Sequence, residues 1–149
     1  MTLVCSVRGV LEPNHAECAN SYFLTNCLVM ISHVLEHIGH NSDIFNSIMK
    51  ELFRICNNNS LIDIIVPHPR HDDFLSDPSH VRPIIPQTLE LYDKELNEKW
   101  KKEKAANTPM ALINKVNFKI EKVEYKIEKK YLKILKEKKI KEKELREMM

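Results

Sequence analysis

The sequence contains only two glycines, Gly9 and Gly39, among 149 residues. Glycine lets a backbone approach a bound nucleotide closely, so the turns that cradle dinucleotides and related cofactors use several glycines within a few residues. Gly9 stands alone in "SVRGVLEP", and no stretch of the chain resembles G-x-G. This scarcity excludes a glycine-rich cofactor loop within the chain.

Paired cysteines and long apolar runs are also missing. Cys5, Cys18, Cys27 and Cys56 are unevenly spaced and form no C-x-x-C pair. This spacing disfavours a cysteine zinc site or a redox dithiol, and it favours reduced thiols. The opening "MTLVCSVRGV" is too short, and is interrupted by Arg8, to be a signal-peptide core or a membrane span. We therefore expect a cytoplasmic protein that makes no membrane contact.

Neither sign of charge dominates, because the formal net charge is only +2. A nucleic-acid-binding protein usually shows a basic face interleaved with aromatic residues, whereas the lysines here alternate with glutamates near the C-terminus. We predict no nucleic-acid partner.

The length suits one domain. We assign residues 1–127 to an α/β domain and residues 128–149 to a charged C-terminal helix.

Hydrophobic patterning predicts a strand, a helix and a second strand in succession. "YFLTNCLVMISHV", from Tyr22 to Val34, is nearly all apolar and is typical of a central strand buried on both faces. A turn follows, and Ser42 or Asp43 can cap a helix in which apolar residues recur every three or four positions. "LIDIIVP", which ends at Pro67, predicts the second strand. Such short connections indicate a βαβ unit with parallel strands.

The second half of the domain begins with a long polar loop, "HPRHDDFLSDPSHVRPIIP". Loops of this length in compact domains are usually functional or disordered. Pro86 suits the first turn of a helix that runs through "QTLELYDKELNEKWKKE". "VNFKIEKVEYKI" alternates in two phases that differ by one residue, which predicts a strand with a bulge or tight bend near Glu121 and Lys122.

The stretch "SHVLEHI" carries two histidines and a glutamate at the spacing H-x-x-E-H. On a helix, this spacing places His33 and His37 on one face with Glu36 as a base, as in a metal-dependent hydrolase. His33, however, ends a strand-like run, and the helix signals begin only at Ser42. We therefore expect no shared helical face and no bound metal, and we keep the metal hydrolase as an alternative function.

Three segments in order, "ISHVLEHI", "IFNSIMKELFRIC" and "LIDIIVPHPRHDDFLSDPSHVRPI", resemble the class I S-adenosylmethionine-dependent methyltransferases. The similarity is to a type 11-like bacterial group that acts on small molecules. In that group the fourth strand ends in a similar H-V-L-E-H-I, and a similar H-P-R-H-D-D-F loop follows the fifth. The resemblance covers Val29 to about Ile127. It implies the C-terminal half of a Rossmann-like fold, with a βαβ unit, a helix, late strands and a C-terminal helix.

The resemblance also implies S-adenosyl-L-methionine as the cofactor and a small molecule as the methyl acceptor. The end of the fourth strand passes the methionine end of the cofactor in this family. The implied cofactor-binding residues are Ser32, His33, Val34, Glu36 and His37. The following loop forms one wall of the acceptor pocket, where imidazoles can accept protons and arginines can clamp an anion. The implied catalytic residues are His68 and His71, and the implied substrate-binding residues are Arg70, Asp72, Asp73, His80 and Arg82. Alternatively, the loop is a self-capped turn cluster.

The sequence departs from this family at its N-terminal end. The residues before Tyr22 are too few to hold three strands with two helices, and no acidic residue clearly replaces the usual ribose ligand. Each charged hydrogen bond lost costs about 1.5 to 3 kcal/mol, so cofactor binding should weaken by several orders of magnitude. We expect a truncated protein that is weakly active or inactive alone.

The missing strands have a second consequence, because the fourth strand would lose its neighbour and expose an apolar edge. Exposed edges pair with other chains. We therefore expect a homo-oligomer or a partner subunit at this edge, and a non-catalytic interaction module is a further alternative function.

Overall fold

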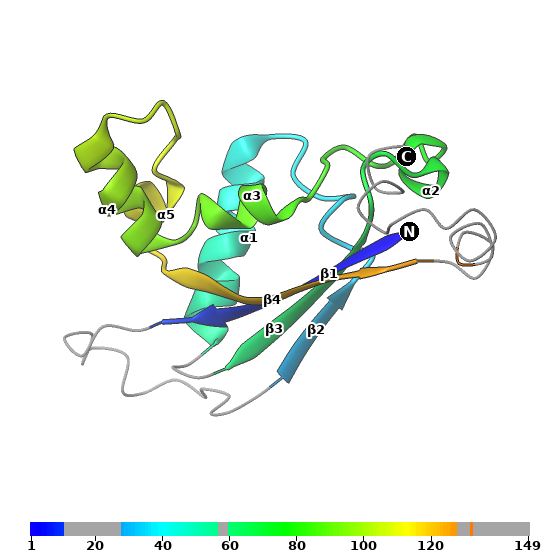
Figure 1. Ribbon diagram of the computed structural model, residues 1–149, viewed down its shortest axis with the longest axis horizontal. Coiled ribbons are helices and arrows are strands. Elements are labelled where there is room, and N and C mark those ends of the chain that lie inside the picture. The colour runs from blue at the N-terminus through cyan, green and yellow to red at the C-terminus, as the bar shows by residue number, and fades with distance from the viewer. Residues whose placement is uncertain (11–27, 57–59, 128–131, 133–149) are drawn as a thin grey trace.

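The computed structural model describes residues 1–10, 28–56, 60–127 and 132, and it has a mixed α/β fold with one four-stranded sheet (Figure 1). The elements in chain order are β1 (Thr2–Gly9), β2 (Leu28–Ser32), α1 (Ser42–Ile55), β3 (Leu61–Pro67), α2 (Asp72–Leu75), α3 (Pro86–Glu90), α4 (Lys94–Glu103), α5 (Met110–Asn114) and β4 (Phe118–Lys126).

The strand order is β2-β3-β1-β4, and the sheet mixes parallel and antiparallel pairs. β2 runs parallel to β3, and α1 connects them, so the predicted βαβ unit is confirmed. β1 pairs antiparallel with both β3 and β4. This N-terminal strand was not predicted, although its apolar residues Leu3, Cys5 and Val7 recur at every second position and are all buried.

β2 differs from the central strand predicted over Tyr22 to Val34. The strand spans only Leu28–Ser32, and residues 22–27 lie outside the described part of the chain. Among the described strands β2 is at an edge, with Leu28 58% and Met30 65% exposed. The prediction of a central strand buried on both faces is therefore wrong, because β1 pairs with β3 on the side away from β2.

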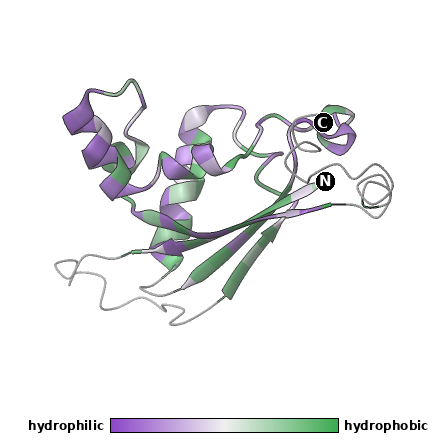
Figure 2. Cartoon of the chain, viewed as in Figure 1, coloured by the Kyte–Doolittle hydropathy of each residue, from purple (hydrophilic) through white to green (hydrophobic). Residues whose placement is uncertain are grey.

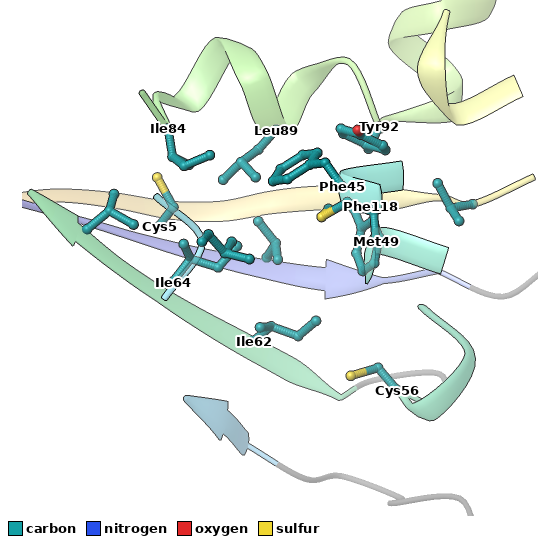
Figure 3. Packing of buried hydrophobic residues seen from close by; sticks show 14 of the residues in the cluster. Cys5, Phe45, Met49, Cys56, Ile62, Ile64, Ile84, Leu89, Tyr92 and Phe118 are labelled. Carbon is teal, nitrogen blue, oxygen red and sulfur yellow. The ribbon is translucent and has the colours of Figure 1, made fainter. Parts of the chain in front are cut away.

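The helices α1, α3, α4 and α5 lie on one side of the sheet, and the core fills the space between (Figure 1). Phe45 and Met49 of α1 lie in the core close to the strands, with Leu89 and Tyr92 from the α3 segment above them (Figure 3). Helix α1 appears where its apolar spacing predicted it. Its N-cap is Asn41, whose side chain accepts a hydrogen bond from the Asp43 N–H at 2.8 Å, and not the predicted Ser42 or Asp43.

The single helix predicted from Pro86 to Glu103 is wrong, because the chain turns between α3 and α4. The Asp93 side chain accepts from the Leu96 N–H at 3.0 Å and caps a new helix. Asn97 is fully buried, donates to the Leu91 carbonyl oxygen and accepts from the Ala111 N–H. These bonds hold the turn and α5 against α4, whose other faces are strongly hydrophilic (Figure 2).

β4 contains the predicted bulge. Ser6 of β1 pairs with Lys122, and Val7 pairs with Ile120, so Glu121 is the extra residue on β4. The predicted C-terminal helix over residues 128–149 lies outside the described part of the chain except for Leu132.

Two further predictions concern cysteines and membranes. Cys5 is a buried free thiol, as expected, and Cys56 is also buried, whereas Cys18 and Cys27 lie outside the described residues. Within residues 1–10, 28–56 and 60–127, no helix has the length and apolarity needed to cross a membrane.

Candidate functional site

The candidate site lies where β2 and β3 end, because parallel strands bring the loops that follow them to the same edge of the sheet. A turn over residues 33–41 follows β2, and the loop over residues 68–85 follows β3. The N–H groups of Val81 and Arg82 both donate to the Glu36 carbonyl oxygen, at 2.9 and 3.3 Å. These bonds join the two loops through their backbones.

The side chain of Arg82, a predicted substrate-binding residue, also joins these two loops. Its Nη2 donates to the Gly39 carbonyl oxygen at 2.8 Å, and its guanidinium carbon lies 4.6 Å from the centre of the Phe45 ring. Its Nε is buried and has no hydrogen-bond partner among the described residues. Arg82 therefore anchors the turn after β2 to the start of α1 through a hydrogen bond and a cation–π contact.

Glu36 is the most deeply buried ionisable side chain of the site, with 0% exposure. Neither of its carboxyl oxygens has a hydrogen-bond partner within the described part of the protein. The Nδ1 atom of His33 lies 3.4 Å from Glu36 Oε1, but the His33 side chain is 54% exposed. A buried carboxyl group without hydrogen bonds costs free energy, so this position requires an explanation.

His37 and His80 lie beside Glu36, although they come from different loops. Their ring centres are 4.5 Å apart. His37 Nδ1 is 2.9 Å from Ser79 Oγ, and His80 Nδ1 is 2.9 Å from the Phe74 carbonyl oxygen. One ligand atom from each of Glu36, His37 and His80 lies within 4.8 Å of the others. We refer to these three residues as the EHH cluster.

Asp77 adds a negative charge next to the EHH cluster. Its carboxylate accepts from both the hydroxyl and the backbone N–H of Ser79, at 2.6 and 2.8 Å. The pKa of Asp77 is held below its ordinary value, chiefly by the hydrogen bond from the Ser79 hydroxyl and then by the one from the Ser79 N–H. The neighbouring His80 and His37 make a smaller contribution in the same direction. Asp77 Oδ2 lies 3.8 Å from His80 Nε2.

Ser79 and Asp77 were not predicted as site residues. The sequence signal that could have found them is Asp-Pro-Ser, in which an aspartate binds the N–H two residues later.

His71, Asp72 and Asp73 form a local helix cap. His71 is buried, and its Nδ1 accepts from the Asp73 N–H at 3.2 Å at the start of α2. The same nitrogen lies 3.1 Å from the Asp73 carboxylate. Asp72 and Asp73 are exposed in the first turn of α2. The self-capped turn cluster that the sequence left open as an alternative is met only at Asp77, which accepts from the Ser79 N–H, since His71 caps α2 and Arg82 binds the Gly39 carbonyl oxygen.

His68 and Arg70 lie on another part of the surface. The His68 N–H donates to the Met1 carbonyl oxygen at 3.0 Å, and its ring centre is 5.9 Å from that of Tyr125 in β4. His68 Nδ1 accepts from the Arg70 N–H at 3.3 Å. Both residues line a hollow of about 270 Å³ together with Leu3 and Tyr125. The predicted acceptor wall is therefore divided between this hollow and the EHH cluster.

The predicted cofactor-binding residues remain together because they are consecutive or nearly so. Ser32, His33 and Val34 are exposed at the end of β2, next to Glu36 and His37. His33 has a positive φ of 53°, which ends the strand. His33 and His37 lie on a turn and do not share a helical face, as the sequence predicted.

Comparison of the chain with protein-family models, curated proteins and solved structures finds no match. The resemblance to methyltransferases therefore stays a prediction from the sequence.

Proposed function

We propose that the chain is the C-terminal part of an S-adenosylmethionine-dependent methyltransferase fold that acts on a small molecule. The observation that carries this proposal is the meeting of the two family-like segments. The parallel β2–α1–β3 unit brings the turn over residues 33–41 against the loop over residues 68–85. Open α/β sheets bind ligands at this edge, beyond the carboxyl ends of parallel strands.

Methyl transfer makes small demands on acid–base chemistry. The acceptor must be held in line with the sulfonium methyl group, and positioning and desolvation can supply about 7 to 11 kcal/mol of the rate enhancement. The exposed Ser32, His33 and Val34 provide a surface for the methionine end of the donor. The acceptor would then lie on the side of His80 and Arg82, whose loop contacts the Glu36 turn, because His68 and Arg70 line a separate hollow beside Tyr125.

We expect this chain alone to bind the donor weakly, because its sequence provides no glycine-rich turn for the nucleoside. A titration of ¹⁵N-labelled protein with S-adenosylmethionine tests the proposal. Amide signals from Ser32 to His37 should shift, with saturation only at concentrations on the order of millimolar. Absence of shifts in this segment at about 10 mM donor, or shifts confined to other elements, would contradict it.

A matched pair of variants makes this titration specific. Val34→Lys places a positive charge beside the proposed sulfonium position and should abolish the shifts. Ile113→Lys makes the same change at an exposed apolar residue of α5 and should leave them unchanged. Equal loss in both variants would indicate non-specific binding and would also contradict the proposal.

A second proposed function, self-association, rests on the position of β2. Leu28 and Met30 are exposed on a strand that is an edge of the described sheet. A strand at the edge of a sheet can pair with a strand of a second chain. We propose that a second copy pairs along β2.

A further inference from the structure

The EHH cluster contains one carboxyl group and two imidazoles, which are common metal ligands, and hydrogen bonds orient the two imidazole rings. We propose that Glu36, His37 and His80 bind a divalent transition-metal ion. The site goes beyond the proposed methyl transfer and does not depend on it. The argument rests on the buried carboxyl group, the tautomers of the two histidines and the spacing of the three ligand atoms.

Glu36 supplies the first part of the argument. Its carboxyl group is completely buried, and neither oxygen has a hydrogen-bond partner among the described residues. Buried carboxylates in proteins are normally paired, hydrogen-bonded or bound to a metal. One of its oxygens lies within 4.8 Å of the ligand nitrogens of His37 and His80. A cation between these three groups would compensate the buried carboxylate.

The hydrogen bonds of His80 fix the nitrogen that it presents. Its Nδ1 lies 2.9 Å from the Phe74 carbonyl oxygen, which can only accept. Nδ1 therefore carries a proton, and in the neutral imidazole Nε2 is left with the lone pair. Metal-binding histidines typically donate their other ring N–H to a carbonyl or carboxylate in this way.

The same conclusion holds for His37 through a chain of two hydrogen bonds. The Ser79 hydroxyl donates to Asp77 Oδ1 at 2.6 Å, so its oxygen can only accept from His37 Nδ1 at 2.9 Å. In the neutral imidazole His37 Nε2 is left with the lone pair. Asp77, Ser79 and His37 thus form a carboxylate-supported arrangement of the kind that orients metal ligands.

The ligand set indicates the class of ion. Two imidazole nitrogens and one carboxylate suit zinc, iron(II) and similar first-row ions, whereas magnesium and calcium prefer oxygen ligands alone. Bonds of about 2.0 to 2.2 Å require the three groups to move together by about an ångström. Three protein ligands leave at least one coordination position open for water or another small ligand.

This site differs from the H-x-x-E-H motif in its ligands. In that motif His33 and His37 bind the metal and Glu36 acts as a base. In the folded chain His33 is outside the EHH cluster, and His80, from the loop after β3, takes its place. The expectation of no metal rested on the absence of a helix at this stretch, but the turn and the distant loop assemble a different ligand set.

The test is a calorimetric titration of the whole chain with Zn²⁺. The unfolding temperature is also measured with and without the ion. We expect one ion per chain and a rise in the unfolding temperature. His80→Ala should weaken binding by at least about tenfold, whereas His40→Ala, which removes an exposed histidine from the same turn, should not change it.

Glu36→Gln provides a second variant in case His80→Ala does not fold. The amide has the same size and lacks the negative charge, and it changes only the 3.4 Å contact with the exposed His33, since neither Glu36 oxygen has a hydrogen bond to the described residues. We expect an unchanged unfolding temperature without Zn²⁺ and loss of the increase with Zn²⁺. Saturable binding that survives both His80→Ala and Glu36→Gln, or that is lost in His33→Ala instead, would overturn the proposal. Absence of stoichiometric binding to the unaltered chain would overturn it as well.

Discussion

Gly39 shows at the scale of one residue how the turn after β2 depends on its sequence. Its φ is +83°, a backbone conformation that residues other than glycine adopt only with strain. A Cβ atom added there would lie 2.7 Å from the Cβ of Phe45. The Gly39 carbonyl oxygen also accepts the hydrogen bond from Arg82. One residue thus connects the turn, the start of α1 and the loop after β3.

Gly39→Ala should reduce the free energy of unfolding by roughly 2 to 4 kcal/mol, because backbone strain adds to a steric clash. Urea denaturation measures this change. Gly9→Ala is the matched control, since a Cβ atom there would lie 3.6 Å or more from its neighbours and Gly9 has no positive φ. Its stability should be unchanged or slightly higher. An equal loss of free energy of unfolding in the two variants would show that a side chain at position 39 does not strain the turn.

At the scale of an element, β4 shows how one extra residue maintains a buried face. Phe118 and Ile120 pack toward the core before the bulge, and Tyr125 does so after it. Strict alternation over this length would place the later residue on the opposite face. Glu121 corrects the phase, because it adds one residue on β4 without a matching residue on β1.

Deletion of Glu121 should therefore be tolerated, because the remaining residues alternate correctly without a bulge. The Arg8–Glu121 ion pair is exposed, and its loss should cost at most about 1 kcal/mol. Deletion of Glu124, the matched change, moves Tyr125 to the other face and should cost roughly 2 kcal/mol or more. Unfolding midpoints of the two deletion variants would measure the difference. The opposite ranking would show that the bulge itself is needed.

At the scale of the whole molecule, the sheet is asymmetric. The large helices lie on one of its sides, and β2 forms an edge of the described sheet (Figure 1). Exposed side chains on β2 alternate with half-buried ones, as expected for a strand with one face on the core. In the described part of the chain β3 is the one strand that pairs with β2, and the other side of β2 is the edge that the proposed second copy would use.

Light scattering at several concentrations should find more than one chain per particle. Met30→Lys should shift the population toward monomers, because a lysine on an edge strand opposes pairing with a second copy. Its effect on the free energy of unfolding should stay within about 0.5 kcal/mol, as for most surface changes. Leu75→Lys changes an exposed residue of α2 and should not alter the mass. A wild-type chain that stays monomeric would contradict proposed self-association through β2.

The sequence by itself determined the elements whose residues repeat with a clear period. The three- and four-residue spacing in α1, the short apolar run of β3 and the two-phase alternation of β4 all appear in the structure. These signals are local, since each records which side of one segment is buried. The break between α3 and α4 was missed because apolar spacing continues across the turn at residues 91–92, after which Asp93 caps α4.

Only the tertiary structure decided which of these segments meet. The sheet order places β1 beside β3, and the parallel β2–β3 pair brings two loops to one edge. His80 reaches Glu36 and His37 in this way, whereas His68 goes to a hollow beside β4. The sequence could name the histidines but could not group them, because contacts between distant loops depend on strand order and packing, which no local period encodes.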